Sequence, residues 1–234
     1  PFADAVGVSA GQIVLDVGCG PGALTAVLVE RLGVDAVAAF DPSPPFVADC
    51  ATRHPGVEVR LGRAEEIPFA DGSFDAALAQ LVLHFVSDTD VAGREMRRVV
   101  RPGGVVAACV WDFAEGMQML RRFWDAALAV EPNAPDEART LRFGREGEIA
   151  EWLGAAGFDD IVETTLTVSS SYDGFDELWA GFLAGIGPAG SFCVSLADEQ
   201  RAALRDELFR RVGSPSGPFV LSATARAAHG HAPR

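Results

Sequence analysis

The sequence predicts an α/β protein built on a doubly wound, mostly parallel sheet. Through the first half, short aliphatic runs alternate with helical stretches, and a glycine-rich turn follows the first run. The runs lack the alternation of polar and apolar residues that half-exposed strands show, so burial on both faces is expected. Strand, helix, strand in this order implies parallel pairing with right-handed crossovers. Seven such runs predict a seven-stranded sheet.

Five of the seven strands are expected in the first 111 residues. They cover residues 13–17, 34–40, 57–61, 74–83 and 105–111, and helices are expected over 22–32, 43–50 and 88–100. Ser43 is expected to cap its helix, where Pro44 and Pro45 are tolerated only in the first turn. Asp88 or Thr89 is expected to cap the next helix.

The second half is richer in helix. Helical segments are expected over residues 112–145, 146–156 and 175–213, and strands over 161–168 and 218–223. With no internal repeat and no low-complexity linker, residues 1–234 are predicted to form a single domain. Its core is residues 11–111, and residues 112–145 and 171–217 are helical insertions.

Composition excludes several chemistries. The 234 residues include 19 basic side chains, all arginine, and 33 acidic ones, so the net charge is −14. Without lysine there is no Schiff-base amine and no P-loop lysine. The negative charge opposes a polyphosphate, so no nucleic-acid partner is expected. The apolar runs are too short to span a bilayer, so no membrane partner is expected.

Cysteine and histidine usage indicates the compartment. The four cysteines and four histidines are scattered and share no ligand spacing, so no metal site is expected and a cytoplasmic protein is predicted. All-arginine basicity and richness in alanine indicate a GC-rich bacterial genome. The chain opens at Pro1 without a basic segment, so no signal peptide is expected, and the missing initiator Met indicates further residues upstream.

The most informative segment is Val14-Leu15-Asp16-Val17-Gly18-Cys19-Gly20-Pro21-Gly22. Its glycines allow a tight turn and the close approach of a ligand at the carboxyl end of a strand. The segment also fits the dinucleotide pattern G-x-G-x-x-A. However, Asp16 would repel a pyrophosphate, and Pro21 removes a backbone donor from an anion site. A ligand with an amine and a sulfonium cation is favoured.

This segment resembles motif I of class I S-adenosylmethionine-dependent methyltransferases. Downstream, Phe40-Asp41-Pro42-Ser43 is similar to the motif that holds the ribose, at the expected offset of roughly twenty residues. Residues 62–69, 74–80 and 100–104 resemble the adenine-flanking segment, motif IV and the turn before the fifth strand. The resemblance covers residues 11–111 and is strongest to the type 11 group, which includes ubiquinone and menaquinone methyltransferases. It implies a Rossmann-like methyltransferase fold.

The resemblance implies S-adenosylmethionine as cofactor and a role for each matching residue. Asp16 would face the methionine amine, Asp41 the ribose hydroxyls, and Gln80 the sulfonium end. The other implied cofactor-binding residues are Gly18, Cys19, Gly20, Gly22, Pro42, Ala64 and Glu65. Alternatives stay open for three of them: helix capping for Asp41, a solvated charge for Glu65 (with Glu66 as the lining residue) and a buried amide for Gln80. Arg63 stands where many relatives carry an acid that faces the adenine amine.

No convincing catalytic base is visible. His84 titrates near neutrality and follows the fourth strand, but its neighbours are apolar and favour a packed histidine. Asp112 is an equally weak candidate. Trp111, His84 and Phe85 are candidates for an acceptor pocket, with core packing as the alternative.

The expected function is methyl transfer from S-adenosylmethionine to a small molecule by in-line displacement. Two alternatives stay open: a protein that binds S-adenosylmethionine or S-adenosylhomocysteine without catalysis, and a nicotinamide-dependent oxidoreductase. Asp16 and the missing lysine count against the oxidoreductase.

Overall fold

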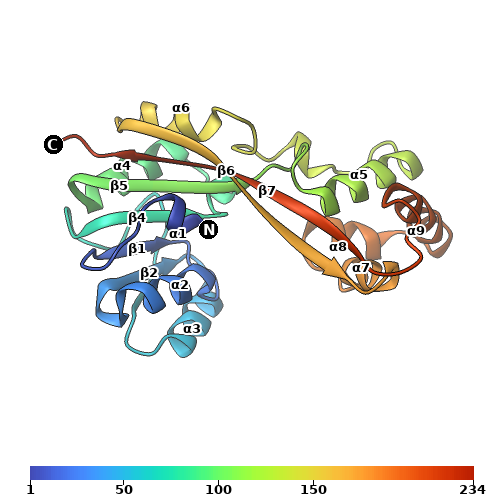
Figure 1. The fold of residues 1–234 in the computed structure, drawn as a ribbon, viewed down its shortest axis with the longest axis horizontal. Coiled ribbons are helices and arrows are strands. Elements are labelled where there is room, and N and C mark those ends of the chain that lie inside the picture. Colours follow the sequence, from blue (N-terminus) through green and yellow to red (C-terminus); the bar gives the residue numbers. More distant parts are fainter. The chain divides into compact units, whose positions relative to one another are not determined.

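A seven-stranded sheet with strand order β3-β2-β1-β4-β5-β7-β6 organises the chain (Figure 1). The computed structural model describes residues 1–234. The first five strands are β1 (Val14–Val17), β2 (Val37–Asp41), β3 (Glu58–Leu61), β4 (Phe74–Gln80) and β5 (Val100–Trp111). They pair in parallel, β1 with both β2 and β4, β2 with β3, and β4 with β5. The predicted seven-stranded, mostly parallel α/β sheet is confirmed.

The last two strands, β6 (Asp159–Tyr172) and β7 (Phe219–His231), are longer than expected. Along β5, the Gly103 N–H donates to the Ala232 carbonyl and the Asp112 N–H donates to the Thr224 carbonyl. Because the partner number falls as the β5 number rises, β5 and β7 are antiparallel. Small residues after Ala223 carry no strong strand signal of their own, and pairing with β5 extends the strand through them.

Nine α-helices connect the strands. They are α1 (Phe2–Ala5), α2 (Ala23–Leu32), α3 (Pro44–Arg53), α4 (Thr89–Val99), α5 (Gln118–Val130), α6 (Glu148–Ala155), α7 (Phe175–Leu183), α8 (Gly187–Ser195) and α9 (Asp198–Arg211). Ser43 occupies the N-cap position of α3 with a proline in the first turn, as expected, but its side chain makes no capping hydrogen bond. Asp88 caps α4 by accepting from the Val91 N–H at 3.0 Å. Residues Val34–Ala36, expected as strand, form a 3₁₀ turn after Gly33, whose φ is +86°.

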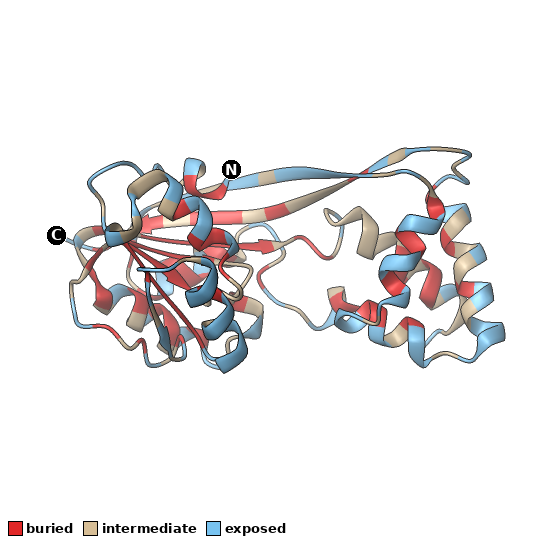
Figure 2. Cartoon of the chain, turned by 90° about the horizontal axis from the view of Figure 1, so that it is seen from below, coloured by how far each residue is buried: buried red, intermediate tan, exposed pale blue.

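Burial follows the two-sided covering of the parallel strands. Every residue of β1 and β2 is buried, whereas β3 and β6, the two edge strands, are mostly exposed (Figure 2). The expected burial on both faces is therefore wrong for β3, because an edge strand has a neighbour on one side only. Helices α4 and α6 approach closely because Gly93 has no side chain: a Cβ there would lie 2.8 Å from Cβ of Ala156. The Trp152 indole donates to the Thr89 carbonyl across the same contact at 2.8 Å.

The chain divides into two compact units. The first comprises residues 1–110, 145–166 and 226–234, and the second comprises residues 111–144 and 167–225. The second unit contains the predicted insertion 171–217 and most of 112–145. It has its own core, in which Phe123 stacks on Phe182 at 4.3 Å and the Trp124 indole donates to Glu137 at 2.9 Å. Trp124 and Trp179 are both buried in this core.

No single helix is both long and apolar enough to cross a bilayer, and α7 and α8 meet that test only as a pair bent by 86°.

Candidate cofactor site

The glycine turn after β1 has positive φ values at its three glycines, a conformation that explains why glycine is found at these positions. Gly18, Gly20 and Gly22 have φ values of 68°, 53° and 95°, the left-handed region that favours glycine. A Cβ on Gly18 would lie 2.8 Å from the Val82 side chain, and one on Gly22 would lie 2.7 Å from the His54 ring. A Cβ on Gly20 would meet no atom within 4 Å. Gly18 and Gly22 therefore allow close packing, and Gly20 faces open space.

Asp41 at the end of β2 is joined to this turn. Its Oδ2 accepts the Gly20 N–H at 2.9 Å, and its Oδ1 accepts the Ser43 N–H at 2.8 Å. The side chain is buried, but each carboxylate oxygen has a second lone pair that can accept a hydroxyl proton. Since Ser43 is the N-cap residue of α3, the carboxylate of Asp41 holds the residue before the helix rather than capping it.

Asp16 lies on β1 and is almost fully buried. Its Oδ2 accepts the Thr25 hydroxyl at 2.6 Å. Burial raises the pKa of Asp16 to about 7; the Thr25 hydrogen bond opposes this shift and the nearby charge of Asp41 adds to it. A buried carboxylate of this kind is suited to a cationic ligand, which would compensate its lost hydration.

A cavity of about 440 Å³ brings these groups together. Its lining includes eight of the residues predicted from sequence: Asp16, Gly18, Cys19, Gly20, Asp41, Pro42, Gln80 and Phe85. The other lining residues are Pro21, Ala23, Leu24, Ser43, Phe46, Leu81 and Val82. No arginine or histidine is among them, so the charged groups facing this cavity are the two carboxylates.

A smaller cavity of about 70 Å³ lies beside the first and shares Gly18, Pro42, Val82 and Phe85 with it. Its remaining lining residues are Phe40, Arg63, Ala64, Glu65 and Val86. Most of these lining residues are apolar, and a small, largely apolar cavity suits an aromatic group. Ala64 and Glu65, expected to flank adenine, both border this cavity.

Glu65, which lines this cavity, is hydrogen-bonded to the segment that precedes α4. Its Oε1 accepts the N–H groups of Ser87 at 3.0 Å and Asp88 at 3.3 Å. Burial opposes ionisation, but these backbone hydrogen bonds and the charge of Arg63 lower the pKa of Glu65 below its ordinary range. Arg63 Nε lies 3.6 Å from Oε2 of Glu65. Glu65 is therefore a held carboxylate rather than a solvated one, and Glu66, which is exposed, is not among the lining residues.

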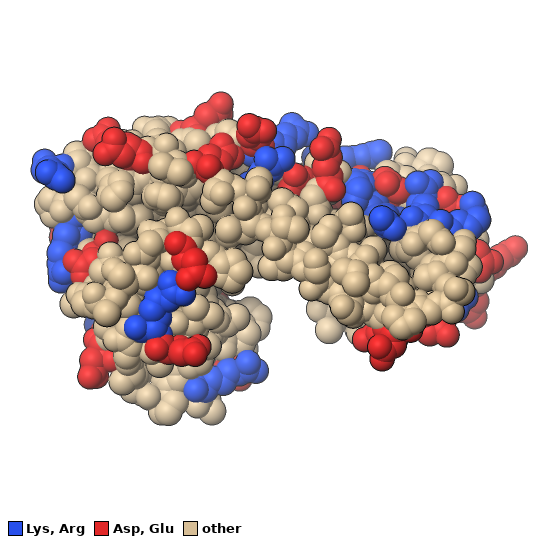
Figure 3. Space-filling view, viewed as in Figure 1, with Lys and Arg blue, Asp and Glu red and all other residues tan.

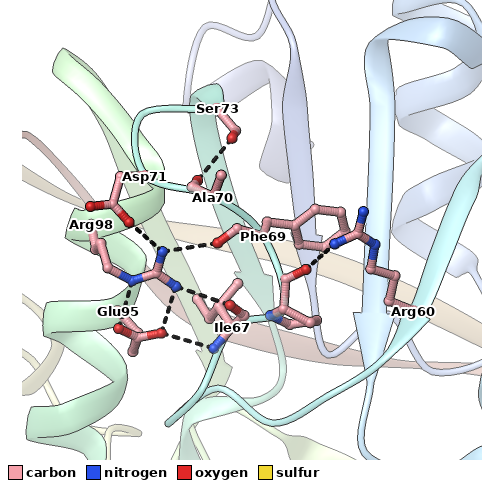
Figure 4. Close-up of polar contacts among 9 residues, drawn as sticks. Arg60, Ile67, Phe69, Ala70, Asp71, Ser73, Glu95 and Arg98 are labelled. Carbon is pink, nitrogen blue, oxygen red and sulfur yellow. Dashed lines mark hydrogen bonds and ion pairs between the residues drawn. The ribbon is translucent and has the colours of Figure 1, made fainter.

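The segment carrying Ala64 and Glu65 is also fastened further along the chain (Figure 4). All five N–H donors of the Arg98 guanidinium are used, on the carbonyls of Ile67 and Phe69 at 2.9 Å each and on the carboxylates of Glu95 and Asp71. Glu95 in turn accepts the Ile67 N–H at 2.9 Å. The loop between β3 and β4 is thus held to α4 at both ends of the helix.

Sequence reasoning missed several residues of the site. Val82 and His54 pack behind the glycine turn, and Leu81 and Phe46 line the larger cavity. Leu81 has a φ of +61°, which is unusual for a leucine. An apolar run after the fourth strand was the visible signal for Leu81 and Val82, but it indicated only a core segment.

The remaining candidates lie elsewhere. Gly22 is buried behind the turn, against His54, and lines neither cavity. His84 is on a 3₁₀ turn (Leu83–Phe85) and lines neither cavity, and burial lowers its pKa to about 4. Trp111 and Asp112 belong to the second unit. Oδ1 of Asp112 accepts the Glu115 N–H at 2.9 Å, so this carboxylate stabilises the turn after β5.

Comparison with known proteins identifies the family. A methyltransferase-domain model matches residues 15–108, the stretch from β1 to β5 that carries both cavities. The demethylmenaquinone methyltransferase of Paenarthrobacter aurescens is 33% identical over 177 residues, 70% of this chain and 69% of that protein. The chain belongs to the type 11 methyltransferase family.

Other relatives match over a shorter stretch. A probable phthiotriol/phenolphthiotriol dimycocerosates methyltransferase of Mycobacterium ulcerans is 36% identical over 121 residues, 51% of this chain. The match spans 45% of that protein, so the chain covers less than half the length of this curated relative.

Solved structures share the fold at low sequence identity. A putative type II methyltransferase from Anaeromyxobacter dehalogenans has a TM-score of 0.67 and 22% identity, over 100% of this chain and 94% of that one. Haemonchus contortus phosphoethanolamine N-methyltransferase 2, solved with S-adenosyl-L-methionine, has a TM-score of 0.59 and 18% identity, over 100% of this chain and 51% of that one.

Proposed function

We propose that this chain binds S-adenosylmethionine in the two adjoining cavities and transfers its methyl group to a small hydrophobic acceptor. The single observation that carries the proposal is the hydrogen-bonded pair of Gly20 and Asp41 at the rim of a cavity that also contains Asp16. The Asp41 carboxylate suits the two ribose hydroxyls, the buried Asp16 carboxylate suits the amine, and the glycine turn lets the nucleoside approach the backbone closely.

The residues present fit the cofactor. Gly20 leaves open space where any side chain would enter the cavity. Asp41 keeps a free lone pair on each oxygen for the ribose hydroxyls. Asp16 is buried and faces the cavity, as a partner of the methionine ammonium requires, and the narrow cavity beside Ala64 suits the adenine ring.

When bound, S-adenosylmethionine supplies an electrophilic methyl group on a sulfur that is already a good leaving group. The protein's part is to hold the cofactor and the acceptor in line and to exclude water, which can supply on the order of 7–11 kcal/mol. Leu24, Leu81 and Phe85 provide apolar wall for this purpose.

The charges that line the larger cavity favour one class of acceptor, because the acceptor must approach the methyl group there. Its two carboxylates are engaged, and its lining has no cation that would bind a phosphate or carboxylate on the acceptor. An uncharged, apolar acceptor is therefore favoured. The matched relatives named as demethylmenaquinone and phthiotriol dimycocerosates methyltransferases support this class, because the names describe apolar compounds.

We place no protein base in the transfer step. His84 is neutral near pH 7 and lines neither cavity. An acceptor that ionises by itself, or that reacts at carbon, needs no such base. We also propose a cytoplasmic bacterial protein without a nucleic-acid or membrane partner. The net charge of −14 and the mixture of acidic and basic side chains on the face drawn in Figure 3 support this, as do four buried thiols.

The test combines binding with transfer. Calorimetry with S-adenosylhomocysteine should give one site per chain, and failure to bind would overturn the proposal. Incubation with methyl-labelled S-adenosylmethionine and an extract of bacterial lipids and quinones should move the label into an apolar product. Binding without transfer to any apolar or polar metabolite would instead favour a cofactor-binding protein without catalysis.

A further inference from the structure

Most residues with a positive φ in this chain are glycines. Fourteen glycines have positive φ, and only four other residues do: Leu81, Phe143, Asp160 and Ser214. For an L-residue this conformation costs roughly 1–2 kcal/mol because Cβ crowds the following carbonyl. Such residues persist only where the side chain or its surroundings compensate the strain.

Three of the four exceptions have an ordinary explanation. Asp160 and Ser214 are exposed residues with short polar side chains, which tolerate this region better than bulky ones. Phe143 is 3% exposed, so its ring is retained by packing. Leu81 is bulky, only half-buried, and borders a cavity rather than a closed core.

The surroundings hold Leu81 in place. It follows β4 directly, and its N–H donates to the Cys109 carbonyl of β5 at 2.8 Å, which continues the pairing of the two strands by one residue. The next side chain, Val82, lies against Gly18. The backbone is therefore fixed on both sides of Leu81, and a glycine at this position would adopt the same turn without strain.

Leu81 lines only one of the two cavities. It lines the larger cavity together with Asp16, Gly20 and Gln80, and it is not among the residues that line the smaller one beside Ala64. In the proposed function, the smaller cavity takes the base and Asp41 takes the ribose. The end that contains Asp16 and Gln80 is left for the amino-acid part and the sulfur.

We propose that Leu81 is a specificity-determining residue of the cofactor site, whose side chain packs against the sulfur-bearing end of the bound nucleoside. The inference rests on the proposed function, because it takes the orientation of the nucleoside from it. This contact explains why the strained backbone at Leu81 is retained. It places an apolar side chain beside the sulfur of the cofactor, where water must be excluded during methyl transfer.

The test uses two variants and two ligands. Leu81→Ala removes the side chain beyond Cβ and keeps the backbone strain of a positive φ. Leu81→Gly removes the whole side chain and relieves that strain. S-adenosylhomocysteine has the sulfur and the amino-acid part, and adenosine lacks them. Both variants should bind S-adenosylhomocysteine about tenfold more weakly, the order expected for a lost apolar contact. Adenosine affinity should stay within about twofold of that of the original protein.

Unfolding in urea separates packing from strain. Leu81→Gly should unfold at a higher urea concentration than Leu81→Ala, because glycine relieves the left-handed strain. Ser214→Gly, a control outside the first unit, should raise the urea midpoint and leave both affinities unchanged. Unchanged S-adenosylhomocysteine binding in both Leu81 variants, or an equal loss for adenosine, would overturn the inference. If the original protein bound neither ligand, the proposed function itself would fail.

Discussion

The Gly20 N–H donates to Oδ2 of Asp41 at 2.9 Å, across 21 residues of sequence. This hydrogen bond joins the turn after β1 to the end of β2, so the two motifs form one structure before any ligand binds. Preorganisation of this kind lowers the entropy cost of ordering the site on binding.

Replacing Asp41 with alanine should therefore affect both binding and stability. The N–H groups of Gly20 and Ser43 lose their acceptor, which costs about 1–3 kcal/mol where water cannot replace it. S-adenosylhomocysteine affinity, measured by calorimetry, should fall by at least tenfold. Adenosine should lose affinity in the same proportion, because the lost contacts are to the ribose. Retained affinity for both ligands would remove the ribose assignment.

Cofactor binding should depend on pH through Asp16. Under the proposed function, Asp16 pairs with the ammonium group of the cofactor only when its carboxylate is ionised. The raised pKa of about 7 leaves Asp16 mostly protonated at pH 6 and mostly ionised at pH 8. The dissociation constant for S-adenosylmethionine should therefore fall by about tenfold from pH 6 to pH 8. Asp16→Asn should bind weakly at both pH values and lose the dependence.

The same carboxyl should affect the stability of the ligand-free protein. Its folded-state pKa lies above the ordinary value of 3.8, so the folded state binds the proton more tightly than the unfolded state. The contribution of Asp16 to stability should fall as the pH rises from about 4 through about 7. Asp16→Asn should consequently raise the urea midpoint at pH 8, where the original carries a buried charge. An equal midpoint in both proteins would contradict the raised pKa.

Gly20→Ala should separate backbone strain from occupation of the cavity. The new Cβ meets no protein atom within 4 Å, but it enters the cavity proposed to hold the ligand, and the alanine must adopt a φ of 53°. Gly7 has a φ of 73° and equally open space, and it lies outside both cavities. Both alanine variants should lose about 1–2 kcal/mol of unfolding free energy. Only Gly20→Ala should lose S-adenosylhomocysteine affinity, by more than tenfold, and an equal loss in Gly7→Ala would point to strain instead.

His84→Gln should leave methyl transfer nearly unchanged. Burial lowers the pKa of His84 to about 4, so the ring is neutral between pH 5 and 8 and contributes no titration to the rate there. Loss of a general base would lower the rate by roughly 10²–10⁴-fold. A decrease of that size in labelled-methyl transfer, with cofactor affinity intact, would restore His84 as a catalytic residue.

Arg98→Lys should weaken the loop between β3 and β4. Lysine replaces a planar group with five donors by a single ammonium, and the carbonyls of Ile67 and Phe69 lose their shared donor group. We expect a loss of about 2 kcal/mol in unfolding free energy, since the site is partly open to water. Arg94→Lys, an exposed arginine on the same helix, is the matched control and should change stability by less than about 0.5 kcal/mol.

Much of this protein follows from local sequence. Burial on both faces gives β1 and β2 their continuous aliphatic runs, and the left-handed turn after β1 requires glycines at 18, 20 and 22. The resemblance to methyltransferases implied cofactor contacts for Asp16 and Asp41, and both acids line one cavity at the carboxyl ends of the parallel strands. The sheet, the turn and the two acids were therefore predictable.

Tertiary contacts decided the rest. The N–H of Leu81 donates to a carbonyl of β5, and this hydrogen bond fixes the backbone where Leu81 lines the cavity. The carboxylate of Glu65 accepts the N–H groups of Ser87 and Asp88, which lie more than twenty residues further along the chain. No local sequence pattern predicts these two positions. An apolar run has the same sequence pattern whether it lines a cavity or packs in a core. A glutamate likewise has the same pattern whether it is hydrogen-bonded or solvated. Strand β7 likewise extends to His231 because β5 offers it a partner. Local propensity determines which backbone conformations a segment adopts, whereas packing between distant segments determines which side chains face a ligand.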